Sequence, residues 1–244
     1  MKVLLRVAML LSLSFFSFSA WSQVEEDVLL EPIRKVFPDF EVGDIELTPI
    51  PGIYKVHWLT EPTGYIYMSE DGKYFFDGKF LEVAEDRIVD LGEKAMEKER
   101  LKYMESLATE ELIVFGAEEP KATVYVFTDV DCYYCQKLHL EVPALTALGV
   151  QIRYLAYPRA GIGSPSYNKI ASAWCADDPN DALTKLKAGE AIPENVCEDN
   201  PVPSQFALGG KVGVRGTPAL ITETGRLLPG YMPAKKLAAE LGIK

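Results

Sequence analysis

Between about residues 23 and 84, hydrophobic and polar positions follow first a helical and then a strand pattern. Glu25–Phe37 has the spacing of a short helix. Aromatic and β-branched runs then predict strands over 45–47, 54–58, 64–68 and 73–76. Gly72 ends a turn signal between the last two strands, because glycine tolerates a positive φ. The pattern predicts a small α+β unit, and a unit of roughly 60 residues has a marginal core that often needs a partner surface.

Three aromatic residues of this unit, Trp58, Tyr65 and Tyr67, are candidates for such a surface. They could serve a second copy of the chain or a bound peptide. The alternative is that each ring fills the small core, which is at least as good an explanation for each one taken singly.

Residues 85–109 are rich in charge and free of proline, and the pattern from about Asp86 to Leu107 is helical. The apolar positions form a thin stripe, consisting of Ile88, Leu91, Ala95, Leu101, Met104 and Leu107. A polar helix with a narrow stripe can bridge two domains. We therefore expect a helical linker, with a surface helix packed on one domain as the alternative.

From residue 110 to the end, strand-like and helix-like runs alternate, which predicts an α/β domain. The expected strands are 112–115, 123–127, 150–156, 219–222 and 226–228. One helix is expected directly after Cys132, and four more are expected over 167–176, 181–188, 204–210 and 234–241. The chain as a whole is therefore predicted to be α+β, with a helix joining two domains.

The first 22 residues have the layout of a secretory signal peptide. A short basic start precedes a serine-diluted apolar stretch, and Ala20-Trp21-Ser22 offers small residues before the expected cleavage point. The stretch is too short and too rich in serine for a membrane span of about 20 residues. Export would bring the chain into a compartment where disulfides persist. Its net charge of −11 disfavours nucleic acid as a partner.

The candidate chemistry lies in Cys132-Tyr133-Tyr134-Cys135, where a strand is expected to end and a helix to begin. Unpaired backbone N–H groups and the helix dipole stabilise an anion there, so Cys132 is the candidate nucleophile. Cys135, one turn along, could resolve a mixed disulfide formed on Cys132. Half of a zinc site and a structural disulfide between the two cysteines are the alternatives. The strand-then-helix context favours redox chemistry, with no metal and no cofactor.

The two other cysteines, Cys175 and Cys197, have no companion residues at metal-ligand spacing. In an oxidising compartment a structural disulfide between them is the simplest interpretation. A pair of free buried thiols is the alternative.

Thr217-Pro218 comes directly before an expected strand, a position where the missing N–H of proline does not interrupt a sheet. A CxxC at the head of a helix, with a later Thr-Pro before a strand, resembles the thioredoxin fold. The chain is more closely similar to bacterial periplasmic disulfide isomerases of the DsbC/DsbG type. The segments that carry this resemblance are 127–139, 153–159, 173–175, 213–219 and 228–231. The resemblance is strong after Thr123 and only one of layout before Leu107.

The resemblance implies a V-shaped homodimer and a division of the chain. Residues 1–22 would be the signal peptide, 23–84 a cystatin-like dimerisation domain, 85–109 the linker, and 110–244 a thioredoxin-like catalytic domain with a helical insertion. It implies that Cys132 is the nucleophile and Cys135 the resolving cysteine. The remaining implied sites are substrate-binding residues Thr217, Pro218, Tyr133 and Tyr134, and a structural disulfide between Cys175 and Cys197. The implied partners are misoxidised secreted proteins and a DsbD-type membrane reductant, and the implied location is the periplasm.

Some residues depart from the pattern of the family. Tyr133-Tyr134 stands where the family commonly has Gly-Tyr, which stiffens the turn and adds a ring to the rim of the site. Asp129 and Asp131 would raise the pKa of Cys132 if exposed, opposing the helix dipole. Val126 occupies the strand position at which thioredoxin carries a buried carboxylate.

The hypothesis that joins these features is a disulfide isomerase or reductase. A dithiol oxidase or a reductase with a narrow set of substrates is one alternative. A chaperone-like dimer that binds unfolded chains is the other, and it is compatible with the main hypothesis.

Overall fold

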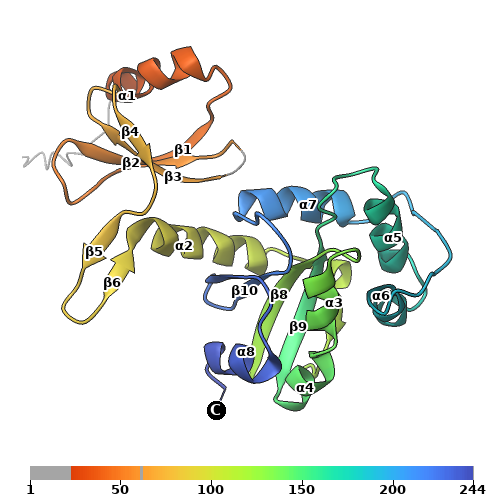
Figure 1. Ribbon diagram of the computed structural model, residues 1–244. Helices are drawn as coiled ribbons and strands as arrows, with labels where there is room; N and C mark the ends of the chain where they lie inside the picture. The colour runs from red at the N-terminus through yellow and green to blue at the C-terminus, as the bar shows by residue number, and fades with distance from the viewer. Residues whose placement is uncertain (1–22, 61–62, 244) are drawn as a thin grey trace, which may run out of the picture.

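The computed structural model describes residues 23–60 and 63–243. The expected signal peptide lies outside the described residues. Figure 1 shows a small unit of one helix and a sheet, a hairpin leading into a long helix, and a larger unit of helices around a second sheet. The observed fold is α+β, as the sequence predicts. In the part of the chain that the structure describes, no helix combines the length and the apolar character needed to cross a membrane.

The small unit is helix α1 (Gln23–Val36) packed on one face of an antiparallel sheet. Its strands pair in the order β1 (Val42–Leu47), β2 (Ile53–Trp58), β3 (Gly64–Ser69) and β4 (Phe75–Asp77). Alternate residues of a strand face opposite sides of a sheet, and those facing the helix form the core. That core consists of Leu29, Leu30, Ile33, Phe40, Val56, Ile66 and Met68.

The turn predicted at Gly72 connects β3 to β4, and Gly72 has a φ of +66°. A Cβ atom there would lie 2.2 Å from the carbonyl oxygen of Leu29 on α1. Two features therefore require glycine at this position: its positive φ and the close approach of the helix backbone.

The predicted aromatic surface is wrong in part. Tyr67 is fully buried, and its ring stacks on Phe76 with the centroids 5.0 Å apart. The Trp58 ring packs edge-on against the buried Phe40. These rings fill the space between elements, and other apolar residues of the unit face outward in their place.

The predicted start of the linker helix is also wrong. Ile88–Asp90 is strand β6, which pairs in antiparallel fashion with β5 (Leu81–Val83). Asp90 then caps helix α2 (Leu91–Glu105), its carboxylate accepting a hydrogen bond from the Glu93 amide. β-branched residues favour the hairpin, and an aspartate at the N-cap sets where the helix begins. The side chains that α2 buries are Met96, Arg100 and Met104, spaced by four, and of these the expected stripe included only Met104.

The larger unit is built on a sheet with strand order β11-β10-β8-β9-β7. The strands are β7 (Ile113–Phe115), β8 (Ala122–Thr128), β9 (Val150–Ala156), β10 (Ala219–Thr222) and β11 (Leu227–Pro229). Only the β8–β9 pair is parallel, and every residue of β8 is buried. Val124 and Val126 belong to one hydrophobic cluster while Tyr125 and Phe127 belong to another, so both faces of this strand are covered.

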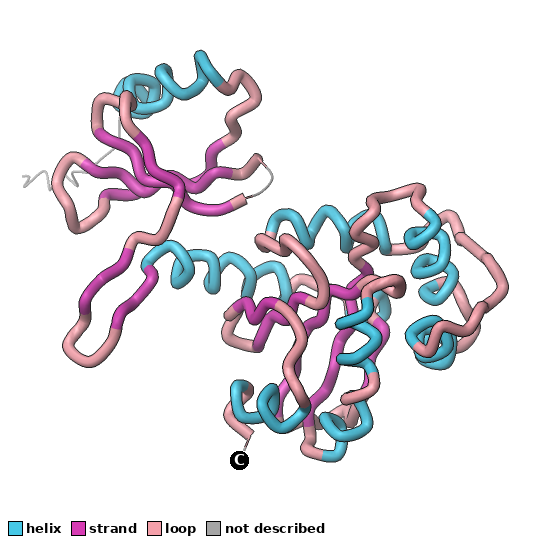
Figure 2. Tube along the Cα trace, viewed as in Figure 1, coloured by secondary structure: helices cyan, strands magenta, loops and turns pink. Residues whose placement is uncertain are grey.

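Seven helices and a short 3₁₀ turn complete the described part of this unit, and Figure 2 shows the helices arranged around the strands. The helices are α3 (Tyr133–His139), α4 (Val142–Ala147), α5 (Pro165–Trp174), α6 (Pro179–Lys187), α7 (Val202–Lys211), α8 (Ala234–Glu240) and the end of α2, and the turn is η1 (Thr109–Glu111). Helices α5, α6 and α7 lie between β9 and β10 in the chain, where the resemblance implies a helical insertion.

The long helix α2 is fastened to the larger unit by Arg100, whose side chain is buried. Its Nε donates a hydrogen bond to the Val212 carbonyl at 2.9 Å, and its Nη1 donates to the Gly225 carbonyl at 3.4 Å. The guanidinium also forms an ion pair with Glu93 on the same helix. A Cβ atom on Gly225 would lie 1.9 Å from the Glu97 carbonyl oxygen, so helix and turn are in direct contact. This docking joins residues more than 100 positions apart, and the sequence pattern does not reveal it.

Candidate active site

Strand β8 ends beside the sequence Cys132-Tyr133-Tyr134-Cys135, and α3 begins directly after Cys132. Cys132 is the N-cap residue, with extended backbone angles, and its sulfur accepts a hydrogen bond from the Cys135 amide at 3.4 Å. This is the position that the strand-then-helix pattern predicts. Both cysteines are buried and unoxidised, and Cys132 retains 3% exposure while Cys135 has none. Cys132 is therefore the thiol nearer to the solvent.

The Thr217–Pro218 loop lies against the two thiols. The Cys132 thiol donates a hydrogen bond to the Thr217 carbonyl oxygen at 3.2 Å, and the peptide bond between Thr217 and Pro218 is cis. The two segments are 85 positions apart in the chain. The Thr217 side chain acts to lower the pKa of both thiols, against the burial that raises it.

The two thiols differ in acidity. Burial acts to raise the pKa of Cys132, but contacts with Thr217 and Cys135 and the charge of Arg159 outweigh it, so the pKa is lowered. Burial raises the pKa of Cys135, and the nearby positive charge of Lys187 opposes this only in part. Cys132 is thus the better thiolate and the better nucleophile near neutral pH.

The carboxylates expected to oppose Cys132 are neutralised. Asp129 is buried, and it accepts hydrogen bonds from the Arg159 guanidinium at 3.0 Å and the Ser166 hydroxyl at 2.7 Å. Burial acts to raise the pKa of Asp129, but these hydrogen bonds prevail and lower it. Asp131 pairs with Lys169 at 2.8 Å. Because both negative charges have partners, they do not prevent the lowering of the pKa of Cys132.

Two aromatic rings stand at the rim of the site. Tyr133 and Tyr134 are both exposed, and their rings meet edge to face with centroids 5.4 Å apart. Tyr134 also stacks on Tyr231, which is held by a hydrogen bond from its hydroxyl to the Glu141 carboxylate at 2.7 Å. The departure from the family dipeptide therefore gives an aromatic surface beside the thiols, suited to contact with apolar side chains or peptide backbone.

Two depressions adjoin the site. One, of about 600 Å³, lies among the N-terminal sheet, α2 and the 213–219 loop, and its wall includes Tyr65, Arg100, Thr217 and Pro218. The other, of about 400 Å³, lies between α3 and α5 and is lined by residues that include Asp131, Gln136 and Lys169. The predicted residues Thr217 and Pro218 thus face a cleft large enough for a peptide segment.

Two ionisable residues, of which sequence reasoning missed Lys187, are buried in this part of the catalytic unit. Lys187, on α6, is buried and donates hydrogen bonds to the Thr128 hydroxyl at 2.6 Å and the Asp129 carbonyl at 2.8 Å. His139, on α3, lies between the hydroxyls of Tyr154 and Thr184. Val126, at the strand position where thioredoxin has a carboxylate, is apolar and buried. The buried ionisable group near the thiols is instead Lys187, which comes from a helix. One feature of the sequence could have indicated that Lys187 is buried. It comes four residues after Leu183, on the buried face of α6.

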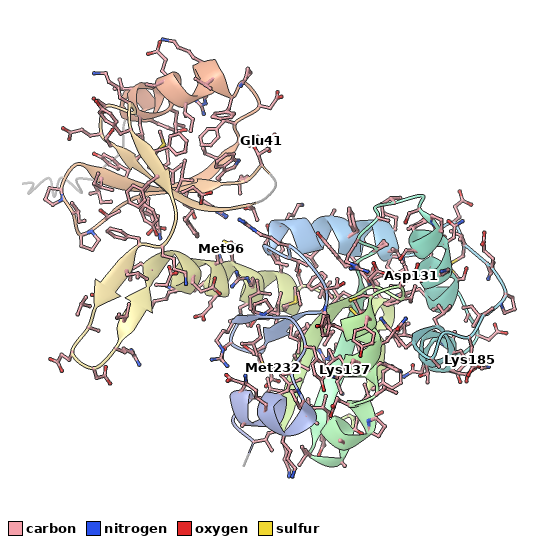
Figure 3. All side chains as sticks on the ribbon, in the orientation of Figure 1. Glu41, Met96, Asp131, Lys137, Lys185 and Met232 are labelled. Carbon is pink, nitrogen blue, oxygen red and sulfur yellow. A yellow bond between two sulfur atoms is a disulfide. The ribbon has the colours of Figure 1, made fainter. Side chains whose placement is uncertain are left out.

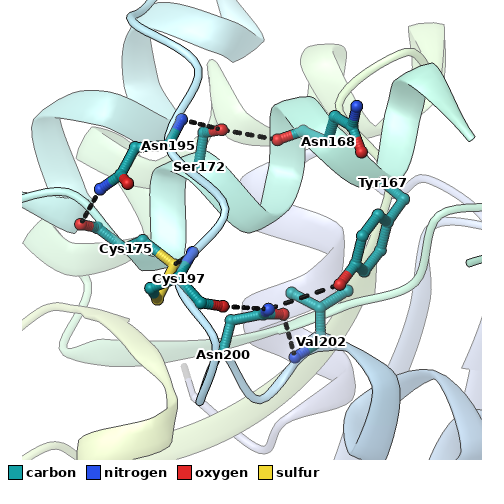
Figure 4. Close-up of a disulfide and its surroundings, with 8 residues drawn as sticks. All are labelled: Tyr167, Asn168, Ser172, Cys175, Asn195, Cys197, Asn200 and Val202. Atoms are coloured by element: carbon teal, nitrogen blue, oxygen red, sulfur yellow. Dashed lines mark hydrogen bonds between the residues drawn. A yellow bond between two sulfur atoms is a disulfide. The ribbon is translucent and has the colours of Figure 1, made fainter. Parts of the chain in front are cut away.

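The four cysteines divide into two pairs. Cys175, at the end of α5, and Cys197 form a disulfide with Cα atoms 5.8 Å apart. Figure 4 shows the neighbouring segments held by hydrogen bonds, including one from the Asn195 amide to the Ser172 hydroxyl at 2.9 Å. Within residues 23–60 and 63–243, no three potential ligands converge in a way that could hold a metal ion. The zinc alternative therefore has no ligand set in that part of the chain.

Two family models match the chain. Residues 20–93 match the N-terminal domain of disulfide bond isomerase proteins, and residues 108–242 match a thioredoxin-like domain.

Curated relatives cover most of the chain. The thiol:disulfide interchange protein DsbC of Escherichia coli is 34% identical over 221 residues, which is 91% of this chain and 89% of that protein. The DsbC protein of Haemophilus influenzae is 37% identical over 85% of this chain and 88% of its own length. Among solved structures, a disulfide interchange protein from Neisseria gonorrhoeae is similar over 57% of this chain and 100% of its own, with 27% identity and a TM-score of 0.50.

Proposed function

The chain belongs to the DsbC family of thiol:disulfide interchange proteins and is a thiol–disulfide oxidoreductase of the disulfide isomerase type, and on that premise we propose which of its residues carry the exchange. Cys132 is the nucleophile and Cys135 the resolving cysteine. The observation that supports this assignment is the placement of Cys132 at the N-cap of α3, beside the Thr217 carbonyl, with its pKa lowered while that of Cys135 is raised.

The first step is attack of the Cys132 thiolate on a wrong disulfide of a secreted protein. The substrate S–S bond breaks, one substrate sulfur leaves as a thiolate, and a mixed disulfide forms on Cys132. In isomerisation, a substrate thiolate attacks again and releases the Cys132 thiolate, with no net oxidation. In reduction, the Cys135 thiolate attacks Cys132, the substrate gains both electrons, and the enzyme is left with a Cys132–Cys135 disulfide.

We assign substrate contact to Thr217, Pro218, Tyr133 and Tyr134. The Thr217 and Pro218 residues border the cleft of about 600 Å³, and both tyrosines are exposed beside the thiols. Peptide backbone beside the Thr217–Pro218 loop would place a substrate disulfide next to Cys132. The natural substrates in this proposal are misoxidised secreted proteins.

The chain acts as a homodimer in the periplasm, with residues 23–84 as the dimerisation domain, 85–109 as the linker and 110–244 as the catalytic domain. Exposed apolar side chains on the N-terminal unit support the dimer, among them Leu47, Phe75, Phe76, Leu81 and Val83. Residues 1–22 would direct export. A DsbD-type membrane reductant would return the Cys132–Cys135 disulfide to the dithiol after each reductive cycle.

The test is the refolding of scrambled ribonuclease by the reduced protein. We expect Cys132→Ser to abolish rescue and Cys135→Ser to retain isomerisation while accumulating mixed disulfide with the substrate. Cys132→Ser with undiminished rescue would disprove the assignment. A dithiol oxidase or a chaperone-like dimer is not favoured by the curated relatives, and rescue that depends on Cys132 separates the isomerase from a chaperone.

A further inference from the structure

Lys187 ends helix α6 with its side chain directed into the protein. Its ammonium group is buried and is held by the Thr128 hydroxyl at 2.6 Å and the Asp129 carbonyl at 2.8 Å. Asp129 and Asp131 form their ion pairs with Arg159 and Lys169, and among the described residues neither carboxylate forms a direct ion pair with Lys187. A buried charge without a counter-ion is costly, and its presence calls for an explanation in the surrounding chemistry.

The Lys187 ammonium lies next to the segment that carries the thiols. Helix α6 packs against α3, which carries Cys135 in its first turn (Figure 1). The Asp129 carbonyl joins the two segments, because it accepts hydrogen bonds from the Lys187 ammonium at 2.8 Å and from the Cys132 backbone amide at 3.3 Å. Burial raises the pKa of Cys135, and the attraction of Lys187 is the largest of the effects that oppose it.

The interaction is reciprocal. Burial lowers the pKa of Lys187 to about 8. The negative charge of Cys135 is the largest of the effects that act to raise that pKa. The other titratable groups that interact with Lys187 are Asp129, Cys132, Asp131 and His139. When the two thiols join in a disulfide, the Cys132 thiolate disappears, and the buried ammonium loses a negative charge that acts on it. The cation is therefore better accommodated in the dithiol form than in the disulfide form.

From this geometry we propose that Lys187 is a positioning residue for the exchange, a buried cation that stabilises the Cys135 thiolate and favours the dithiol over the Cys132–Cys135 disulfide. The proposal rests on the assignment of Cys132 and Cys135 as the exchanging pair. In the resolving step the Cys135 thiol gives its proton to solvent, its thiolate attacks the Cys132 sulfur, and the substrate leaves as a thiolate. Lys187 makes the first of these events easier without touching the substrate.

The competing explanation is that Lys187 is only a structural tie between α6 and the end of β8, through its bond to Thr128. A structural tie would affect stability but would leave the acidity of Cys135 unchanged. Chain-wide stability cannot separate the two explanations, so the readout has to be the thiol itself.

The primary experiment measures the pKa of Cys135 in the full chain, in a Cys132→Ser background, from the pH dependence of alkylation. We expect Lys187→Met to raise this pKa by about one unit, which is a tenfold loss of thiolate below the pKa. Lys187→Arg should restore most of the acidity because it restores the charge. Lys185→Met is the matched control, because Lys185 is on the same helix but lies at the outer edge of the molecule, where it pairs with Asp181 (Figure 3).

A second measurement uses the chain with both cysteines, equilibrated with glutathione. Lys187→Met is expected to shift the equilibrium toward the Cys132–Cys135 disulfide by at most about tenfold, or about 30 mV, because the Cys132 thiolate of the dithiol form loses a nearby cation. A Cys135 pKa and a disulfide equilibrium equal to those of Lys185→Met would overturn the proposal. Failure of the wild-type chain to rescue scrambled ribonuclease would instead overturn the proposed function, because the acidity of Cys135 does not depend on a protein substrate. If Lys187→Met does not fold, Lys187→Gln keeps a polar group for Thr128 and removes only the charge.

Discussion

The two sheets of this protein differ in how much of their surface is buried. Strand β8 of the larger sheet is buried along its whole length, whereas all three residues of β4 at the edge of the smaller sheet are exposed. The larger unit covers both faces of its sheet with helices, and the smaller unit has one helix for its sheet. The difference indicates that the catalytic unit is complete in one chain, while the N-terminal unit retains apolar surface for a partner.

One phenylalanine in each sheet gives the largest expected contrast. Phe127 on β8 is fully buried, and Phe127→Ala is expected to lower the free energy of unfolding by about 4 kcal/mol, from lost transfer energy and the cavity left behind. Phe75 on β4 is exposed, and Phe75→Ala is expected to change it by less than about 0.5 kcal/mol. Hydrogen exchange followed by mass spectrometry measures the stability of each region separately.

The same pair tests the role of the exposed surface. Phe75→Ala is expected to weaken self-association in analytical ultracentrifugation, and Phe127→Ala to leave it unchanged below its unfolding transition. Equal destabilisation by the two substitutions would contradict the comparison, since it would mean that Phe75 is already part of a core.

The two histidines provide the next contrast, because one lies in each region. Burial, and then the charge of Lys187, lower the pKa of His139 to about 4. An unfolded histidine binds a proton near pH 6.5, so the unfolded state takes up more protons between pH 6.5 and 4 and stability falls as the pH falls through that window. The expected loss is about 3 kcal/mol, and His139→Gln should remove it from a series of denaturation curves.

His57 in the N-terminal unit is expected to act in the same direction but more weakly. Burial lowers its pKa, while the negative charges of Glu99 and Asp44 act against that shift. His57→Gln should therefore flatten the pH profile less than His139→Gln does. A larger effect from His57→Gln would reverse the assignment of acid sensitivity to the catalytic unit.

The junction of the two regions depends on Arg100. Arg100→Met leaves the Val212 and Gly225 carbonyls without their donor and is expected to cost about 2 kcal/mol. In Arg100→Met we expect faster hydrogen exchange and faster proteolysis of α2, while both sheets stay folded. Lys102→Met is the control on the same helix, because Lys102 is exposed and pairs with Glu99 at the surface. Equal protection of α2 in the two variants would show that α2 is held by other contacts.

The smallest effects are expected at exposed ion pairs, where the two regions should behave alike. Lys35 pairs with Glu31 on α1, and Lys185 pairs with Asp181 on α6, each one helical turn apart. Water screens both pairs, so Lys35→Met and Lys185→Met should give no change beyond experimental error. A clear loss from Lys185→Met would also disqualify it as the control for Lys187→Met.

The sequence alone determined the local features of this protein. Hydrophobic periodicity predicted α1 and β9 near their observed bounds, and the strand-to-helix transition placed Cys132 at an N-cap, because these features depend on residues within a few positions of one another. It misassigned residues 86–90 as helix because the strand there is stabilised by pairing with β5 and not by its own residues alone.

Only the tertiary structure decided the chemistry around the thiols. Thr217 reaches Cys132 across 85 positions, and Lys187 reaches Thr128 across 59. Arg159 and Lys169 neutralise Asp129 and Asp131, whose effect on Cys132 the sequence left undecided. The acidity of a buried group is set by burial and by charges within a few ångströms, and chain folding determines which charges those are. The sequence thus pointed to Cys132 as the candidate nucleophile, while the packing of α6 against α3 placed a buried lysine near it.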